Sequence, residues 1–159
     1  MFTKQSYSAS LEENYGLLAK QLDALLDGES NQIANLSNAS ALLNQFLEDT
    51  NWVGFYLMEQ GELVLGPFQG LPACVRIAVG RGVCGTAVSE RRTLRIEDVH
   101  VFPGHIACDA ASNSEIVIPL IKDGEVIGVL DIDSPSKARF SEQDQAGLET
   151  FVRHLMKHI

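Results

Sequence analysis

Hydrophobic positions near the start of the chain recur at the three- and four-residue steps of an amphipathic helix. The sequence Ser10-Leu11-Glu12-Glu13 has the form of a capping box, in which the serine oxygen accepts a backbone N–H and Glu13 reaches back. Asp27-Gly28 follows the apolar stripe, and glycine suits the left-handed position after a helix. These features predict a first helix with one apolar face, formed by Leu11, Tyr15, Leu18, Leu22 and Leu25.

Two later segments have the same helical spacing. One runs toward Glu48-Asp49 and is expected to pair with the first helix; its apolar positions are Ile33, Leu36, Leu43, Phe46 and Leu47. The other closes the chain after Ser141, which is expected to cap it; its apolar positions are Leu148, Phe151, Val152, Leu155, Met156 and Ile159.

Between these helices the pattern becomes typical of strands. Residues 52–57 are aromatic and β-branched, Gln60-Gly61 follows, and Leu63-Val64-Leu65 resumes the apolar pattern, which predicts a hairpin. Residues 115–121 and 126–132 form a second predicted hairpin around Asp123-Gly124, a dipeptide favoured in tight turns. Its paired residues have numbers that sum to about 247, which places Glu115 opposite residue 132 or so.

Helices at both ends of a strand-rich middle predict an α+β fold of one domain, residues 1–159. The expected architecture is a central antiparallel sheet with the N- and C-terminal helices on one face and a ligand pocket under loops on the other. Residues 68–113 are predicted to be mostly loops, with a short helix after Arg81 and a strand near residues 94–96. Long ordered loops in a small domain are usually functional.

Composition excludes several classes of protein. With 45% hydrophobic residues the chain has enough apolar side chains for a core, and a net charge of −9 repels nucleic acids and anionic membranes. The longest apolar run, residues 116–121, is far shorter than the roughly 20 residues of a membrane helix. Because the first residues lack a hydrophobic secretory segment, we expect a cytoplasmic protein.

All three cysteines, Cys74, Cys84 and Cys108, lie in the loop-rich segment. An odd number without an export signal argues against a permanent disulfide framework, and buried structural thiols are the ordinary interpretation. Zinc bound by three thiolates and His105 or His100 is a second interpretation, but no close cysteine pair of the usual kind is present. Thiol redox chemistry fits better, because it requires only a thiolate and a second cysteine within reach.

Residue chemistry alone leaves the identity of the nucleophile open. Cys84 lies at the predicted start of a short helix, where the helix dipole favours a thiolate. Cys108 has His105 three residues before it, which favours the anion, and Asp109 directly after it, which opposes it. The glycines of residues 80–85 resemble a dinucleotide fingerprint, but without a βαβ context we interpret them as a tight turn from strand to helix.

Three acids are expected to converge at one end of the second hairpin. Asp131 and Asp133 project from the same strand face, and Glu115 begins the partner strand. They are either a solvated strand end, a divalent metal site, a site for the ammonium group of an amino acid, or a group in which one acid stays protonated as a hydrogen-bond donor. Trp52 and Tyr56 share one face of the first strand, where they are either sheet core or an aromatic wall around a small apolar group.

Taken together, the motifs resemble the free methionine-(R)-sulfoxide reductases, which are single-domain GAF enzymes. The resemblance runs from about residue 51 to the last helix and rests on Asn51-Trp52-Val53-Gly54-Phe55-Tyr56, Gly66-Pro67-Phe68-Gln69-Gly70, Pro72-Ala73-Cys74, Gly82-Val83-Cys84-Gly85, Asp98-Val99-His100, Phe102-Pro103-Gly104-His105-Ile106-Ala107-Cys108-Asp109, Ser114-Glu115-Ile116-Val117 and Gly128-Val129-Leu130-Asp131-Ile132-Asp133-Ser134-Pro135.

The resemblance implies reduction of free L-methionine (R)-S-oxide to L-methionine without a cofactor or metal, with thioredoxin as reductant and a homodimer as the usual assembly. It implies that Cys108 attacks the sulfoxide sulfur and that Cys84 or Cys74 then closes a disulfide. It further implies that Glu115, Asp131 and Asp133 bind the substrate ammonium and help to protonate the oxygen, while Trp52 and Tyr56 enclose the methyl group. A GAF module that only senses a small ligand is the alternative.

Overall fold

The computed structural model describes residues 2–106 and 110–159. The predicted helices are confirmed, and side chains cap the N-termini of the two N-terminal helices and of the last helix. Ser10 Oγ accepts the Glu13 N–H at the start of the first helix, Asn31 Oδ1 accepts the Ala34 N–H at the second, and Ser141 forms a complete capping box with Asp144 at the last. The helices are α1 (Leu11–Leu26), α2 (Gln32–Phe46), α3 (Gly82–Glu90) and α4 (Glu142–Leu155).

Among the described residues, six strands form one antiparallel sheet in the order β3-β2-β1-β6-β5-β4. Both predicted hairpins are present, and both turns have two residues of positive φ, Gln60-Gly61 and Asp123-Gly124, as tight hairpins require. The strands are β1 (Trp52–Glu59), β2 (Glu62–Gly70), β3 (Arg76–Ala78), β4 (Leu94–Ile96), β5 (Ser114–Lys122) and β6 (Glu125–Ser134), and a short 3-10 helix, η1, spans Val99–Val101.

The loop-rich segment contains more strand than the pattern predicted. Strand β2 continues past Leu65 to Gly70, and the short strand β3 was not expected. The extension crosses Pro67, which lies where the β1–β2 register shifts between Gly54 and Tyr56. A bulge tolerates a proline because no ladder hydrogen bond is lost there, so the apolar pattern alone underestimates the strand.

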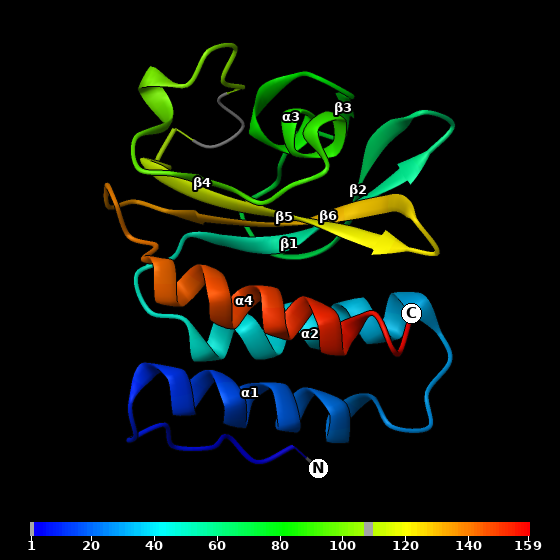
Figure 1. Ribbon diagram of the computed structural model, residues 1–159, viewed down its shortest axis with the longest axis vertical. Coiled ribbons are helices and arrows are strands. Elements are labelled where there is room, and N and C mark those ends of the chain that lie inside the picture. Colours follow the sequence, from blue (N-terminus) through cyan, green and yellow to red (C-terminus); the bar gives the residue numbers. More distant parts are fainter. Residues whose placement is uncertain (1, 107–109) are drawn as a thin grey trace.

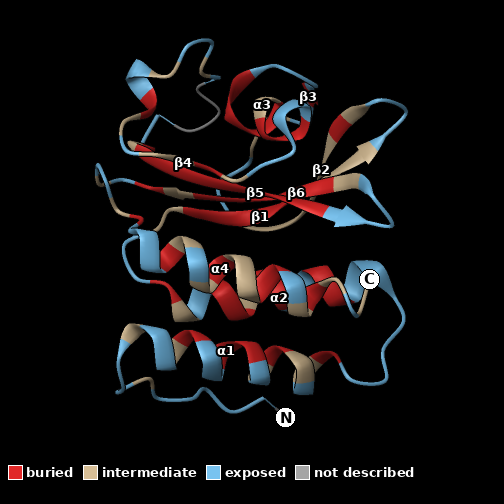
Figure 2. Cartoon of the chain, in the orientation of Figure 1, coloured by how far each residue is buried: buried red, intermediate tan, exposed pale blue. Residues whose placement is uncertain are grey.

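The elements form layers (Figure 1). Helices α2 and α4 pack on one face of the sheet, and α1 lies beyond them, in contact with both. Helix α3, η1 and the long loops cover the opposite face. Buried positions concentrate in the central strands and on the helix faces that point toward them (Figure 2). The sheet therefore separates a helical core from a second, smaller core on the α3 side.

The β5–β6 register places Glu115 directly opposite Asp133. The turn-based estimate gave residue 132, and the difference of one residue comes from a bulge between Leu120 and Ile121. Beyond this bulge Glu115 and Val117 face the α3 side, together with Val129 and Asp131, whereas Ile116 and Ile118 face the helical core. The bulge thus helps to decide which acids meet across the two strands.

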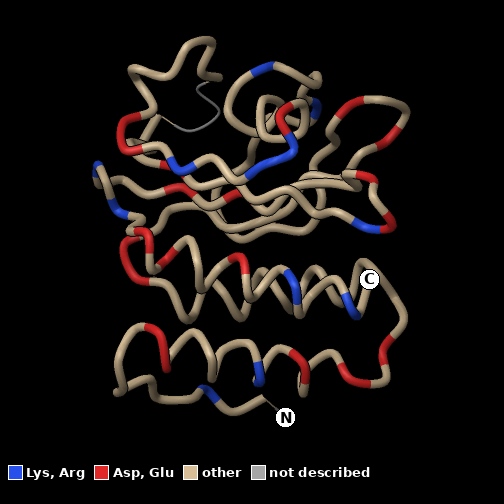
Figure 3. Tube along the Cα trace, viewed as in Figure 1, with Lys and Arg blue, Asp and Glu red and all other residues tan. Residues whose placement is uncertain are grey.

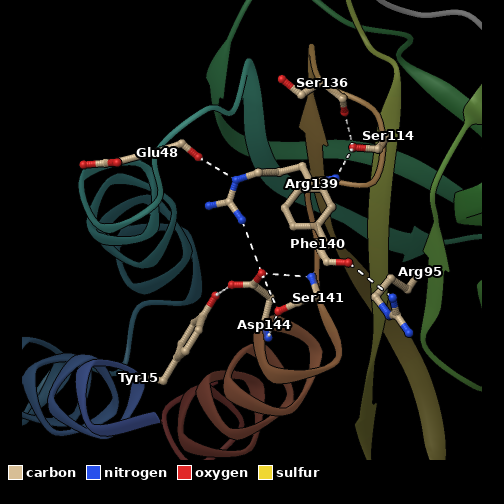
Figure 4. A network of polar contacts seen from close by, with 9 residues as sticks. All are labelled: Tyr15, Glu48, Arg95, Ser114, Ser136, Arg139, Phe140, Ser141 and Asp144. Atoms are coloured by element: carbon tan, nitrogen blue, oxygen red, sulfur yellow. Dashed lines mark hydrogen bonds and ion pairs between the residues drawn. The ribbon is translucent and has the colours of Figure 1, made fainter. Parts of the chain in front are cut away.

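A buried polar network joins the helical layers to one end of the sheet (Figure 4). The Tyr15 hydroxyl of α1 donates to Asp144 at 2.7 Å, and the same carboxylate forms an ion pair with Arg139 at 3.3 Å. Arg139 also donates to the Glu48 carbonyl, and its backbone N–H donates to Ser114 Oγ at the start of β5. This network fixes α1 and α4 relative to the strand that carries Glu115.

Acidic positions occur on helices, turns and loops, with basic positions scattered among them (Figure 3). In the part of the chain that the structure describes, no helix is long and apolar enough to cross a membrane.

Candidate functional site

A pocket lies on the α3 side of the sheet, where β1, β5 and β6 meet the start of α3 and the flanking loops. Six of the residues predicted for the site line it, and only Cys74 and Cys108 of the predicted set are not among its described lining residues. The lining residues are Trp52, Tyr56, Pro72, Ala73, Ile77, Arg81, Gly82, Val83, Cys84, His105, Ile106, Ser112, Glu115, Asp131 and Asp133.

Trp52 and Tyr56 form one wall of this pocket. Their rings are stacked with centroids 5.8 Å apart, and Phe68 continues the stack at 5.1 Å from Trp52. The polar end of each ring contacts the loop after β2: Trp52 Nε1 donates to the Leu71 carbonyl at 3.1 Å, and the Tyr56 hydroxyl donates to the Cys74 carbonyl at 2.8 Å. The aromatic pair thus both lines the pocket and holds the loop that carries Cys74.

Two of the predicted acids, Glu115 and Asp131, meet the thiol of Cys84 at the base of the pocket. A ligand atom of each residue lies within 4.8 Å of those of the other two, and the Cys84 Sγ to Glu115 Oε1 distance is 4.0 Å. All three side chains are buried. Asp131 Oδ1 has no hydrogen-bond partner among the described residues, while Asp133 is only partly buried at the pocket rim.

Burial and mutual repulsion favour the neutral forms of these groups. Burial, followed by the charge of Asp131, raises the pKa of Glu115 well above its usual range. Burial raises the pKa of Asp131 to about 6, although hydrogen bonds from Glu115 and Cys84 oppose the shift. Near neutral pH the pair therefore holds a proton on Glu115 and a negative charge on Asp131. Of the interpretations drawn from the sequence, this environment favours the one in which one acid stays protonated.

The expectation that the helix N-terminus favours a thiolate at Cys84 is wrong for this environment. Cys84 does lie in the first turn of α3, as predicted. Burial, followed by the charges of Asp131, Glu115 and Asp133, nevertheless raises the pKa of the Cys84 thiol well above its usual range. A helix dipole contributes a fraction of a charge, which is outweighed by desolvation and neighbouring carboxylates.

The two described cysteines differ in their bonding. Cys84 is a free thiol, whereas Cys74, on the loop between β2 and β3, is disulfide-bonded. Cys108 lies outside the described residues. His105, predicted to stabilise a thiolate at Cys108, lines the pocket, but burial and the neighbouring His100 lower its pKa. A neutral imidazole is a weaker partner for an anion than the imidazolium that the sequence argument assumed.

Arg81 is a pocket residue that sequence reasoning considered only as part of a glycine-rich turn. It precedes α3 and is the only Lys or Arg among the described lining residues. Ser112 was also missed; its hydroxyl accepts a hydrogen bond from the Asn51 amide at 3.1 Å. A charged residue between glycines before a predicted helix was the available signal for Arg81, whereas the sequence carried no comparable signal for Ser112.

Comparison with known proteins agrees with this fold. A family model described as GAF domain matches residues 21–159. The free methionine-R-sulfoxide reductase of Escherichia coli (strain K12) is 59% identical over 145 residues, which cover 91% of this chain and 88% of that protein.

Two solved structures are similar over nearly their whole length. The free methionine-R-sulfoxide reductase of Neisseria meningitidis, in complex with its substrate, has a TM-score of 0.94 at 41% identity and covers 99% of this chain and 95% of its own. The fRMsr of Staphylococcus aureus, also in complex with substrate, has a TM-score of 0.88 at 56% identity, with coverages of 97% and 99%. The chain therefore belongs to the free methionine-R-sulfoxide reductase family of GAF-domain proteins.

Proposed function

We propose that this protein reduces free L-methionine (R)-S-oxide to L-methionine in the cytoplasm, with thioredoxin as the reductant. The observation that carries the proposal is the buried pair Glu115 and Asp131 beneath an aromatic wall, in a pocket flanked by the loop of Cys74. The names of the relatives, and the substrate complexes of two of them, support the same substrate.

The acids supply two functions that this substrate requires. An ammonium group is a cation that offsets the buried negative charge on Asp131. A protonated Glu115 donates a hydrogen bond to the sulfoxide oxygen, and this polarises the sulfur toward attack. Asp133, at the rim, adds negative charge near the ammonium. Trp52 and Tyr56 provide an apolar surface for the methyl group, and Arg81 is the lining cation suited to the substrate carboxylate.

The chemical steps follow from thiol and sulfoxide chemistry. The Cys108 thiolate attacks the sulfoxide sulfur, the oxygen is transferred to the cysteine with uptake of a proton, and methionine leaves as Cys108 becomes a sulfenic acid. A second thiol attacks the sulfenic sulfur, a disulfide forms and water leaves. The dithiol of thioredoxin then reduces the disulfide by exchange and is itself oxidised.

We assign the second thiol to Cys74 rather than to Cys84. Cys74 lies on a loop and is disulfide-bonded, whereas Cys84 is a free, buried thiol. The raised pKa of Cys84 also makes it a poor source of thiolate near neutral pH. In this scheme Cys84 contributes to the lining of the pocket and does not carry electrons.

The decisive experiment is a thioredoxin-coupled assay that follows NADPH oxidation with the R and S epimers of free methionine sulfoxide separately. We expect turnover with the R epimer only, loss of methionine formation in Cys108→Ser, and retained single-turnover methionine formation in Cys74→Ser. No turnover with either epimer would overturn the proposed reaction, and an active Cys108→Ser would overturn the assignment of the nucleophile.

Selectivity for the free amino acid provides an independent check. N-acetyl methionine (R)-sulfoxide lacks the ammonium group, so it leaves Asp131 buried without a cation. We expect its kcat/KM to be at least a hundredfold lower than that of the free substrate. Similar values for the two would show that the acids do not bind an ammonium group.

A further inference from the structure

The base of the pocket has the donor set of a transition-metal site as well as that of an ammonium site. We propose that Cys84, Glu115 and Asp131 bind a divalent ion of the zinc class, and that this ion inhibits the protein by occupying the position of the substrate ammonium. Metal binding is a property of this chain alone, whereas the inhibition rests on the proposed function.

The geometry is close to that of a bound ion. Zinc–ligand distances of about 2.0–2.3 Å in a tetrahedral site separate neighbouring ligand atoms by roughly 3.5 Å. The three ligand atoms already lie within 4.8 Å of one another, and the thiol and Glu115 carboxylate are 4.0 Å apart. Small side-chain rotations would bring the three ligand atoms to the separations of a tetrahedral site. The residues belong to α3, β5 and β6, and α3 packs against both strands.

A second observation points to a missing ligand. Asp131 is only 6% exposed, and its Oδ1 atom has no hydrogen-bond partner among the described residues. Unsatisfied buried oxygens are costly, and a native structure rarely retains one without a reason. A cation at this position satisfies that oxygen and offsets the repulsion between the two carboxyl groups.

The donor types select the kind of metal. One thiolate and two carboxylates suit Zn²⁺ or Cd²⁺, whereas Ca²⁺ and Mg²⁺ require six or more oxygen ligands. Three protein ligands leave a fourth position for water, as in accessible zinc sites. The set differs from the Cys₃His set considered from the sequence, since it uses only Cys84 among the cysteines. When the ion binds, the protons of the Cys84 thiol and of the Glu115 carboxyl group both pass to solvent.

Cd²⁺ alone is the probe, added to substrate-free protein in which the disulfide of Cys74 is intact and Cys84 is a free thiol, while the absorption of the cadmium–thiolate bond is measured. We expect one ion per chain, loss of the band in Cys84→Ser, and at least tenfold weaker binding in Asp131→Asn, which keeps the thiol. The matched control is the double variant Cys74→Ser/Cys108→Ser, which should keep the band and the affinity.

A retained band in Cys84→Ser, a lost band in the double variant, or no binding by the unmodified protein would overturn the site. Asp131→Asn decides the question if Cys84→Ser does not fold, since unchanged affinity there also contradicts the site. Equal thermal midpoints of the metal-free proteins serve as the folding control.

Inhibition is measured separately, with Zn²⁺ added to the thioredoxin-coupled methionine sulfoxide assay and no small-molecule dithiol present to chelate the ion. Competitive inhibition relieved by excess substrate is expected. Cadmium binding with non-competitive or absent zinc inhibition would overturn the shared position but not the metal site. A protein inactive on methionine sulfoxide would overturn the proposed function, while the cadmium titration would still decide the site.

Discussion

Asp131 and Ile132 are neighbours on β6 whose side chains enter opposite layers of the molecule. Ile132 belongs to the helical core, whereas Asp131 is buried beside Cys84 and Glu115 on the α3 side. The alternation of a strand predicts that they point in opposite directions. It does not predict that the polar side is buried as deeply as the apolar one. This burial raises the pKa values of Glu115, Asp131 and the Cys84 thiol.

Replacing Asp131 by Asn should stabilise the protein at pH 8 more than at pH 4. The pKa of Asp131 is raised from 3.8 to about 6, so the folded state binds the proton more tightly than the unfolded state does. The resulting stabilisation is complete below pH 4 and is lost as the pH rises from about 4 to about 6. Because Asn does not ionise, the variant avoids this loss, which we expect to be about 3 kcal/mol.

Urea unfolding at both pH values measures the effect. Asp123→Asn is the control, since Asp123 is exposed in a hairpin turn that accepts Asn-Gly equally well. A difference between Asp131→Asn and the unmodified protein that does not depend on pH would contradict the argument.

Tyr56→Phe should slow recycling of the protein without removing the aromatic wall. The change deletes the 2.8 Å hydrogen bond to the Cys74 carbonyl while the ring stack with Trp52 is retained. One such bond is worth about 1 kcal/mol, or roughly a fivefold change in rate. We expect steady-state turnover with thioredoxin to fall by this factor, while single-turnover methionine formation stays unchanged. An equal fall in both rates would show that Tyr56 does not act through the Cys74 loop.

At the scale of elements, close packing between helices depends on particular small residues. Helix α4 crosses α1 at Gly147, where an added Cβ would lie 2.2 Å from Cγ of Tyr15. Helical spacing predicted both helices, but it contained no sign that a glycine lay at their crossing. The reason is that a glycine inside a helical pattern usually lowers helix stability, so its benefit appears only when the partner helix is present.

Gly147→Ala should therefore destabilise the protein despite the higher helix propensity of alanine. Overpacking against Tyr15 is expected to lower the free energy of unfolding by about 1–3 kcal/mol. Gly16→Ala is the matched control in α1, because no atom lies within 4 Å of its added Cβ. It should raise the free energy of unfolding by roughly 0.5–1 kcal/mol. Urea titration distinguishes the two, and a stabilising Gly147→Ala would show that the helices separate freely.

At the scale of the whole molecule, the network around Asp144 connects the helical layers with the sheet end that carries the pocket. Asp144 is 5% exposed and receives hydrogen bonds from Tyr15, Ser141 and Arg139.

The homodimer implied by the family resemblance remains a prediction. Sedimentation should give twice 17.4 kDa, and a 17.4 kDa species would contradict it.

Arg139→Ala should destabilise the whole domain, because it leaves the Asp144 carboxylate buried without its cation. Hydrogen bonds to charged groups are worth about 1.5–3 kcal/mol, and we expect a loss of about 2 kcal/mol in the free energy of unfolding. Arg153→Ala on the exposed face of α4 is the control, with a change below about 0.5 kcal/mol. Equal effects of the two variants on denaturant unfolding would show that the network does not hold the layers together.

Local signals determined much of the fold. Capping residues and apolar spacing located α1, α2 and α4, and Gln60-Gly61 and Asp123-Gly124 located both hairpins, because these features depend on residues a few positions apart. The same logic brought Glu115, Asp131 and Asp133 to one end of the sheet and Trp52 and Tyr56 to one face. The resemblance of short motifs supplied the family, which the comparisons show.

Tertiary structure alone decided the remaining features. Strand β3 forms at the sheet edge by pairing with β2, the bulge near Leu120 sets Glu115 opposite Asp133, and Trp52 and Tyr56 bind the backbone of the Cys74 loop. The protonation of Cys84 and Glu115 likewise depends on what surrounds them from other elements. The physical reason is that desolvation and pairing across strands are set by distant segments of the chain, whereas periodicity and capping report only on neighbours in sequence.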